Sequence, residues 1–440
     1  MDFLLDRYLF GKLPFNVSKD WQQSIKFKAM ELFAWADWAC GAQDPRVLLQ
    51  YHTSFFFCEL VFVFLALLTF IHAWRTGGRN VYLWIGIVIH ALNTENLCYW
   101  IPDLDNFWQA QSVLTFFGRR APLYILFGIY LMFDYTASIA AKRLQLPWWA
   151  EGPAVGLGAV LLDIPYDIMG VKLLWWSWHD TDPNIFDRTY WVPWTSYYFH
   201  AAFACSFTWI LKASRKLLCP QEYDWKLFPR EFFCAFLAGT GAFWVGSMQF
   251  LPIYHTFHDL FRVHTECCTL FFLATYALIV WLADRTPNLK AGVRATRSFF
   301  DELGVAVILH YLFFMVLVVL AEPENIVATG LHQPIGPCDV TEVAMTLTGY
   351  KLYKKKYLCP TRYDEKYFDF HCVPGKKPPR MIDGNPVEWY TVCGTPFENH
   401  TEYVFVIWTA AILGFTVLYQ WLARSGDPKD KVKVYKSKKE

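Results

Sequence analysis

Residues 161–200, LLDIPYDIMGVKLLWWSWHDTDPNIFDRTYWVPWTSYYFH, combine two carboxylates with a segment otherwise apolar enough to lie in a membrane. A carboxylate in hydrocarbon is costly, so Asp163 and Asp167 suggest a functional site. Their i, i+4 spacing puts both carboxyl groups on one helical face, and Pro165 between them loosens the backbone. The alternative is structural, because polar residues in membrane helices often only bond a neighbouring helix or water.

The composition around this stretch is that of a membrane protein. Hydrophobic residues make up 55% of the 440 and charged residues only 18%, which is too apolar for an ordinary soluble protein of this length. The net charge of +1 lacks the large positive excess that is typical of nucleic-acid-binding proteins. The charges cluster between long apolar runs, which predict an all-α, polytopic integral membrane bundle of about nine transmembrane helices. The predicted spans are 53–74, 81–100, 122–140, 151–173, 196–212, 231–252, 265–283, 303–322 and 403–422.

Basic residues in the short loops predict the orientation of this bundle. Loops after the first, third, fifth and seventh spans are richer in Lys and Arg than the alternate loops, so we expect the odd-numbered spans to end in the cytosol. In the N-terminal segment, residues 19–39 carry apolar side chains at helical spacing, typical of a helix on the membrane surface or one packed on a luminal domain. The expected domains are a luminal segment 1–52, an eight-helix bundle 53–322, a luminal loop 323–402, a last span 403–422 and a basic cytosolic tail 423–440.

The long loop contains four cysteines, Cys338, Cys359, Cys372 and Cys393. In the lumen they would form two disulfides, and the sequence leaves three pairings open. Their spacings are not those of CxxC metal sites, so a metal-binding role has less support. We therefore expect a small disulfide-tied luminal domain.

Three short signals bear on the compartment. Sequons occur at Asn16 and Asn399, both on the predicted luminal side, and Asn16 is the better glycosylation candidate because Asn399 lies close to the last span. Lys436 and Lys438 resemble the dilysine retrieval signal of endoplasmic reticulum membrane proteins, which the retrieval coat machinery binds. The alternative is a generic basic tail that follows the charge rule of membrane topology.

His90, Glu95 and His200 are further candidates for chemistry. By the predicted spans they lie, like the two aspartates, on the luminal side of the membrane. A site opening between helices near one leaflet would need such a concentration of acids and histidines. A tryptophan-dense turn at the same level offers substrate-binding faces, although aromatic belts explain some of its members without a site. Its tryptophans are Trp175, Trp176, Trp178, Trp191 and Trp194.

A histidine triplet joins the sixth and seventh predicted spans. His255, His258 and His264, with Asp259 or Glu266, could hold zinc with an open coordination position. The spacing matches no recognised zinc signature, and histidines at a membrane interface often only bond water and headgroups. Zinc is therefore the alternative to a site that uses no cofactor.

Segment 163–197 has three features in a fixed order. An Asp-bearing helix leads into a Trp-x-Trp turn and then a Val-Pro-Trp step, and an earlier helix carries a His followed by a Glu. The residues concerned are Asp163, Asp167, Trp176, Trp178, Val192, Pro193, Trp194, His90 and Glu95, with Arg120-Ala121-Pro122-Leu123 before the third span. Over about 85–210 this pattern resembles the bacterial and archaeal carotenoid hydratase family, multi-span enzymes that add water to a terminal isoprenoid double bond. The resemblance implies a membrane isoprenoid lipid as substrate.

That chemistry is coherent with the residues present. Hydrating a trisubstituted alkene needs a proton donor and passes through a tertiary carbocation; a carboxyl group in apolar surroundings can be the donor, and tryptophan faces can stabilise the cation. The expected catalytic set, which needs no metal or organic cofactor, is Asp163, Asp167, His90, Glu95 and His200.

Two other function classes stay open. A lipid or small-molecule transporter, or a membrane scaffold, also fits a polytopic bundle, although transporters commonly show internal repeats and this sequence shows none. A metal-dependent lipid hydrolase would use the histidine triplet. Nothing in the sequence sets an oligomeric state.

Overall fold

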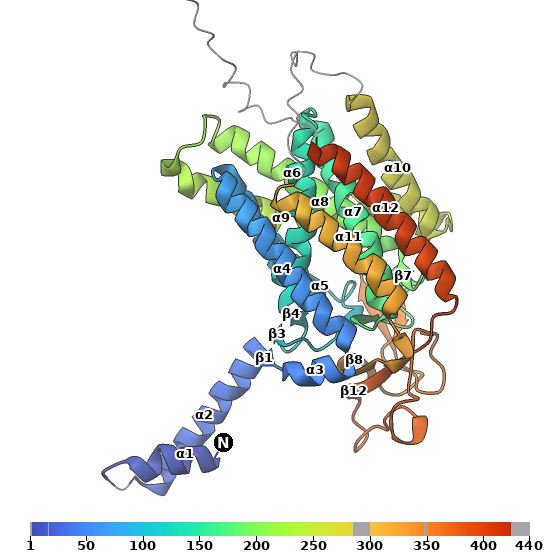
Figure 1. The fold of residues 1–440 in the computed structure, drawn as a ribbon. Coiled ribbons are helices and arrows are strands. Elements are labelled where there is room, and N and C mark those ends of the chain that lie inside the picture. The colour runs from blue at the N-terminus through green and yellow to red at the C-terminus, as the bar shows by residue number, and fades with distance from the viewer. Residues whose placement is uncertain (1, 16, 285–299, 347–348, 350, 424–440) are drawn as a thin grey trace, which may run out of the picture.

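The computed structural model describes residues 2–15, 17–284, 300–346, 349 and 351–423 (Figure 1). Helices account for 65% of the structure and pack into an elongated bundle. Small sheets gather at one end of that bundle, so the predicted all-α class describes the bundle but not its sheet-bearing end. The strands arise in connecting segments, whose residues lack the continuous apolar runs that predicted the helices.

Seven helical segments of the described chain are long and apolar enough to cross a membrane, which supports the predicted membrane class. α5 (Arg79–Trp100) and α8 (Trp194–Leu218) belong to the bundle but fall short of that apolarity, since α5 carries internal polar residues and α8 ends in basic ones. The predicted count of about nine spans is therefore not confirmed. The seven segments are α4 (Thr53–Thr76), Ile125–Arg143, α7 (Trp148–Lys172), Trp225–Leu260, α10 (Thr265–Asp284), α11 (Glu302–Leu320) and α12 (His400–Ala423).

Two of these segments are composite. Ile125–Arg143 consists of two widened turns, η2 (Ile125–Ile129) and η3 (Leu131–Tyr135), followed by α6 (Thr136–Arg143). Trp225–Leu260 consists of η5 (Trp225–Leu227), α9 (Phe228–Ile253) and η6 (Tyr254–Leu260). Widened turns inside helices often mark functional positions, and both η3 and η6 carry acidic residues that matter below.

α7 lies at the centre of the bundle, and 83% of its most apolar 18-residue stretch is buried. It packs along α8, which in turn packs along α9. The α7–α8 contact is close because Gly156 has no side chain: a Cβ there would lie 2.4 Å from the carbonyl oxygen of Ala201. This packing buries the side chains of Asp163 and Asp167.

Ion pairs close the end of the bundle that is opposite the sheets (Figure 1). Arg79 and Arg215 both contact the buried carboxylate of Glu231, at 2.6 and 2.8 Å. Arg143 pairs with Asp301 at 2.8 Å. Described basic residues from the ends of the first, third and fifth predicted spans therefore lie at one end of the molecule.

Short strands from the connecting loops cover the other end. β2 (Phe107–Gln109) pairs with β5 (Trp176–Trp178), and β6 (Arg188–Thr189) with β7 (Val192–Pro193). A third sheet has the order β1-β3-β4. Its strands are β1 (Cys40–Ala42), β3 (Leu114–Phe116) and β4 (Ala121–Pro122), and nearby short helices are α3 (Pro45–Tyr51) and η4 (Pro183–Ile185).

The segment between α11 and α12 forms a small β-domain at this end. Its disulfides join Cys338 to Cys359 and Cys372 to Cys393, which selects one of the three pairings left open by the sequence. One sheet has the order β11-β12-β8, and β9 pairs with β10. The elements are η7 (Pro323–Asn325), β8 (Val327–Ile335), β9 (Thr341–Met345), β10 (Lys351–Lys355), β11 (Phe368–Asp369), η8 (Pro374–Lys376) and β12 (Val387–Gly394).

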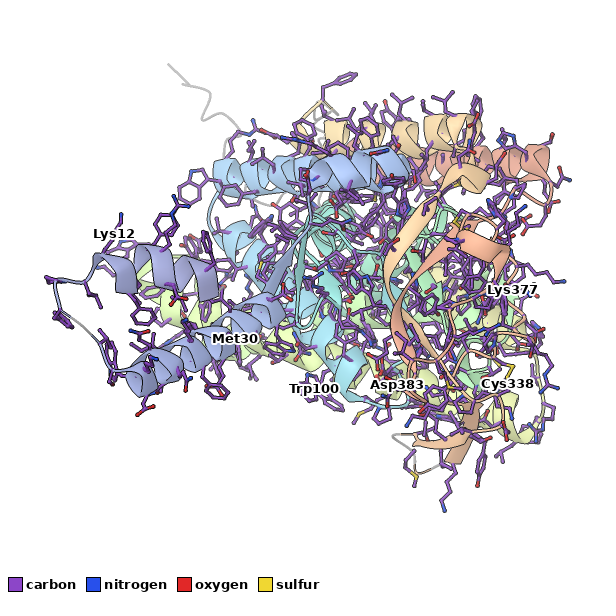
Figure 2. All side chains as sticks on the ribbon, turned by 90° about the horizontal axis from the view of Figure 1, so that it is seen from below. Lys12, Met30, Trp100, Cys338, Lys377 and Asp383 are labelled. Atoms are coloured by element: carbon purple, nitrogen blue, oxygen red, sulfur yellow. A yellow bond between two sulfur atoms is a disulfide. The ribbon has the colours of Figure 1, made fainter. Side chains whose placement is uncertain are left out.

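An N-terminal arm projects from the sheet-bearing end (Figures 1 and 2). It consists of α1 (Asp2–Tyr8), η1 (Phe10–Lys12) and α2 (Lys19–Ala39), and no residue of α2 is buried. Figure 2 shows Lys12 and Met30 on this arm, away from Cys338 of the β-domain. The last turn of α2 contacts the sheet-bearing end, where Asp37 pairs with Arg119 at 2.8 Å, and the predicted placement of helix 19–39 on the membrane surface stays a prediction.

The described residues include only part of the predicted sorting signals. Asn399 is exposed just before α12, and its side-chain oxygen accepts a hydrogen bond from the backbone amide of Glu402 at 3.3 Å. Asn16, Lys436 and Lys438 lie outside the described residues.

Candidate functional site

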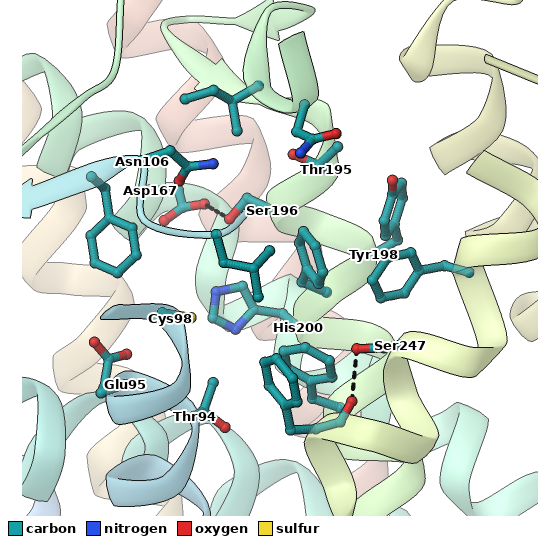
Figure 3. Close-up of a pocket in the computed structure, with 18 of the residues that line it drawn as sticks. Thr94, Glu95, Cys98, Asn106, Asp167, Thr195, Ser196, Tyr198, His200 and Ser247 are labelled. Carbon is teal, nitrogen blue, oxygen red and sulfur yellow. Dashed lines mark hydrogen bonds between the residues drawn. The ribbon is translucent and has the colours of Figure 1, made fainter. Parts of the chain in front are cut away.

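A cavity of about 190 Å³ lies within the bundle, between α5, η2, η3, α7, α8 and α9 (Figure 3). The wall includes residues far apart in the sequence that were predicted as site residues: His90, Glu95, Asp167, Trp176, Trp178, His200 and His255.

Asp163, Asp167 and His200 form the polar centre of this region. One ligand atom from each side chain lies within 4.8 Å of the other two. Ser196 donates a hydrogen bond of 2.7 Å to Asp167 Oδ2 (Figure 3). His200 Nε2 lies 3.5 Å from Asp163 Oδ1, and neither oxygen of the buried Asp163 side chain has a hydrogen-bond partner among the described residues. Asp167 lines the cavity, whereas Asp163 is buried next to it and is not part of the wall.

A second histidine–aspartate pair lies on the same cavity wall. His90 Nε2 is 3.9 Å from Asp134 Oδ2, and His90 Nδ1 is 3.3 Å from the hydroxyl of Thr94. Asp134 comes from η3 and is buried. Sequence reasoning missed it, although Asp134 is a carboxylate inside the predicted span 122–140 and carries the same signal that identified Asp163.

Glu95 is held by tyrosine hydroxyl groups. Tyr130 donates to Glu95 Oε1 at 2.9 Å and Tyr99 lies 3.3 Å from Oε2. The Arg120 guanidinium stacks over the Tyr99 ring, 4.6 Å from its centroid. The single Tyr99 hydroxyl proton has a closer acceptor in the Arg120 carbonyl oxygen, at 2.9 Å, so Tyr130 is the firm donor to Glu95, which lines the cavity.

The tryptophan turn is only partly at the cavity. Trp176 and Trp178 on β5 line it, and Trp176 lies over Tyr166 with ring centroids 5.1 Å apart. This contact needs Gly170, where a Cβ would lie 2.2 Å from the Trp176 ring. The other three tryptophans do not line the cavity and pack elsewhere: Trp175 in the core, Trp191 against Tyr367 and Trp194 against Tyr197.

A polar set of side chains marks the cavity end nearest the sheets. The Asn184 amide donates to Asp103 Oδ1 at 2.8 Å, and Asn106 lies nearby in the wall. Burial raises the pKa of the Asp103 carboxyl, and the Asn184 hydrogen bond opposes this shift. Deeper in the bundle the wall is aromatic, with Phe203, Phe243 and Phe250. Polar groups lie among these rings as well, since His90 and Ser247 also line the cavity.

The histidine triplet does not converge on a shared point. His255 Nδ1 contacts Asp259 at 2.6 Å, and His258 Nδ1 contacts the same carboxylate at 2.8 Å. His264 instead contacts Asp187, at 3.2 Å. The three histidines are not among the described groups with the geometry to hold a metal ion, and the alternative of zinc at the triplet stays a prediction.

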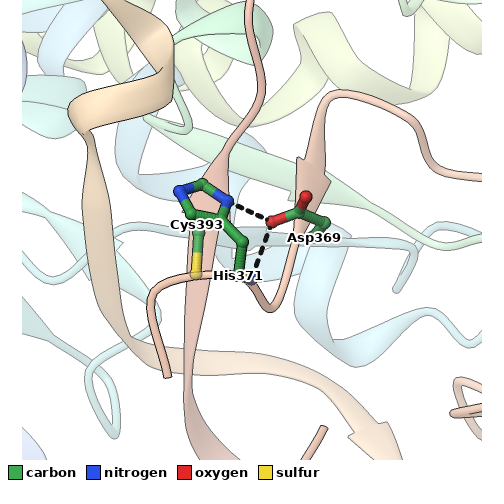
Figure 4. A group of neighbouring side chains, drawn as sticks. All are labelled: Asp369, His371 and Cys393. Atoms are coloured by element: carbon green, nitrogen blue, oxygen red, sulfur yellow. Dashed lines mark hydrogen bonds and ion pairs between the residues drawn. The ribbon is translucent and has the colours of Figure 1, made fainter. Parts of the chain in front are cut away.

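Two groups of described residues have the geometry to hold a metal ion. One is the centre of Asp163, Asp167 and His200. The other is Asp369, His371 and Cys393 in the β-domain (Figure 4), but the Cys393 sulfur is in a disulfide and cannot act as a thiolate ligand. The central group is therefore the better metal candidate.

Comparison with known proteins assigns the chain to a family. The family described as "Domain of unknown function (DUF7802)" matches residues 1–423. The chain belongs to this family. No curated protein matches the chain, and no solved structure matches it. The family description names no activity.

Proposed function

We propose that this protein is a membrane-embedded enzyme that adds water to a double bond of an isoprenoid-like lipid. The observation that carries this proposal is the cluster of Asp163, Asp167 and His200 beside an aromatic cavity. None of the described Lys or Arg side chains forms an ion pair with either aspartate. Two carboxyl groups so close together in an apolar interior favour sharing one proton over a double negative charge.

In the proposed reaction each member of the cluster has a role. Asp167 faces the cavity and donates its proton to the alkene, which forms a C–H bond and leaves a tertiary carbocation. The faces of Trp176 and Tyr166 stabilise that cation. A cavity water then forms the C–O bond, and His200 accepts the proton that this water loses. Transfer of that proton through Asp163, 3.5 Å from His200, restores the carboxyl pair.

The decisive experiment replaces each carboxyl group by an amide. Asp167→Asn and Asp163→Asn keep the side-chain shape but remove the proton donor. Turnover of an isoprenoid lipid in ¹⁸O-labelled water is followed by mass spectrometry. It should fall at least 100-fold, because general acid catalysis typically contributes a factor of about 10²–10⁴ in rate. Folded yield should stay near that of wild type, and Asp369→Asn in the β-domain is the matched control.

Different results would support the other classes. If both amide variants lose folded yield together with activity, the aspartates act as interhelical contacts. If the purified protein holds a co-purified lipid but never turns it over, a transporter or scaffold is favoured.

A metal-dependent lipid hydrolase is the second candidate, because Asp163, Asp167 and His200 offer three convergent ligand atoms. Zinc accepts carboxylate and imidazole ligands of this kind. Elemental analysis of the purified protein separates the two candidates. Stoichiometric zinc that disappears in Asp167→Asn would favour the hydrolase, whereas activity that survives a chelator would favour hydration.

We further propose that the protein resides in the endoplasmic reticulum membrane, with a luminal N-terminus and a cytosolic C-terminus. Disulfides form in the lumen and are rare in the cytosol, which favours a luminal position for the β-domain. Arg79, Arg143 and Arg215, which follow the first, third and fifth predicted spans, lie at the opposite end of the bundle, as the charge rule expects for the cytosolic side. The resemblance of Lys436 and Lys438 to a retrieval signal supports binding by the coat machinery.

A further inference from the structure

An alternating chain of histidine and aspartate side chains runs from the surface to the cavity wall. η6 contributes His255, His258 and Asp259. Asp187 comes from the turn before β6, and His264 lies just before α10. His264 is half exposed, with 52% of its side chain accessible, whereas the His255 side chain is 11% exposed and lines the cavity.

Each step along the chain joins an imidazole nitrogen to a carboxylate oxygen. His264 Nε2 is 3.2 Å from Asp187 Oδ1, and His258 Nε2 is 3.7 Å from Asp187 Oδ2. On its other side, His258 Nδ1 is 2.8 Å from Asp259 Oδ1. Asp259 Oδ2 is in turn 2.6 Å from His255 Nδ1. The 3.7 Å step between His258 and Asp187 is the one longer than a hydrogen bond.

Neighbouring groups hold these histidine and aspartate side chains in place. The Tyr254 ring stacks on the His258 ring, with centroids 4.7 Å apart and an interplanar angle of 14°. The backbone amide and hydroxyl of Thr265 donate to Asp187 Oδ2, at 2.8 and 2.7 Å. The acidic side chain of Asp103 also faces His255. Asp187 is therefore held by Thr265, and the His258 ring is held by Tyr254.

We propose that this chain is a proton relay between the aqueous side and the cavity, and that it sets how fast the Asp163–Asp167 pair regains a proton. This inference rests on the proposed function of that pair as proton donor. Each imidazole accepts a proton on one nitrogen and releases one from the other, and the carboxylates pass it between them. One proton entering at His264 gives one proton leaving at His255, and cavity waters carry it to Asp167. No electrons move.

Hydrogen–deuterium exchange of the carboxyl pair tests the relay. The probe is the infrared carbonyl band of the protonated pair in the full-length protein in detergent, identified as the band that Asp167→Asn removes. After transfer into D₂O, the shift of this band reports the exchange rate. Asp259→Asn should slow that rate at least tenfold, and His264→Ala should slow it similarly but recover when imidazole is added to the buffer.

His371→Gln is the matched control, because His371 also contacts an aspartate, Asp369 at 2.5 Å, but lies in the β-domain outside the relay. It should exchange at the wild-type rate. Equal rates in wild type and Asp259→Asn would overturn the relay while leaving the donor pair intact. If Asp259→Asn does not fold, the half-exposed His264→Ala variant with imidazole rescue decides. A wild-type protein without the carbonyl band would contradict the donor pair and the relay together.

Discussion

At the scale of the residue, His179 shows how burial outside the bundle couples stability to pH. Its side chain is buried, and this burial, aided by the charges of Lys354 and Arg188, lowers the pKa of His179 to about 3. An unfolded chain has the ordinary histidine pKa of about 6.5. The unfolded state therefore binds the proton first, and stability falls as pH drops from about 6.5 toward 3. At pH 4 the loss from this residue is at most about 3 kcal/mol, at roughly 1.4 kcal/mol per pKa unit.

His179→Gln should remove this contribution of His179 to the loss of stability at low pH. The drop in melting temperature between pH 7 and pH 4 should become smaller than in wild type, although the variant can be less stable at both values. Thermal unfolding in detergent measures it, and His371→Gln, at an exposed histidine, should leave the wild-type slope unchanged. A slope in His179→Gln equal to that of wild type would show that the residue titrates normally.

At the scale of the element, the Cys372–Cys393 disulfide anchors β12 of the small β-domain. It closes a loop with a sequence separation of 21, and removing a native disulfide from a small domain typically costs about 2–5 kcal/mol. The double variant Cys372→Ser, Cys393→Ser should therefore unfold the β-domain at lower temperature, detected by limited proteolysis between α11 and α12. Cys40→Ser, at an exposed free cysteine, is the control. Four free thiols in non-reduced wild-type peptides would refute the pairing.

At the scale of the whole molecule, the two ends of the bundle should lie in different compartments. Glycosidase treatment should shift the mobility of the wild type but not of Asn16→Gln, since Asn16 is expected in the lumen. A sequon added after the C-terminus should stay unmodified. Glycosylation at that added sequon, with none at Asn16, would invert the proposed orientation.

The sequence by itself was sufficient for features that depend on local pattern. Long apolar runs predicted the membrane helices because a helix in hydrocarbon needs about 20 apolar residues. The i, i+4 spacing of Asp163 and Asp167 placed both on one face of α7, and both prove to be buried. The loop cysteines predicted two disulfides, since pairing of cysteines in a luminal loop needs only their number and compartment. The short strands of the β-domain were missed because they lack a comparable run.

Only the tertiary structure decided which of these groups meet. Asp167 faces the cavity while Asp163 lies behind it, and Trp176 faces it while Trp191 does not. Asp134 joins from η3, and Asp187 comes from a distant turn to bind His264. Such meetings depend on how segments far apart in the sequence pack against one another, and helix packing is set by side-chain shape over the whole interface. Periodicity within a single segment contains no such information, so the sequence predicted several residues of the site but not how they are arranged.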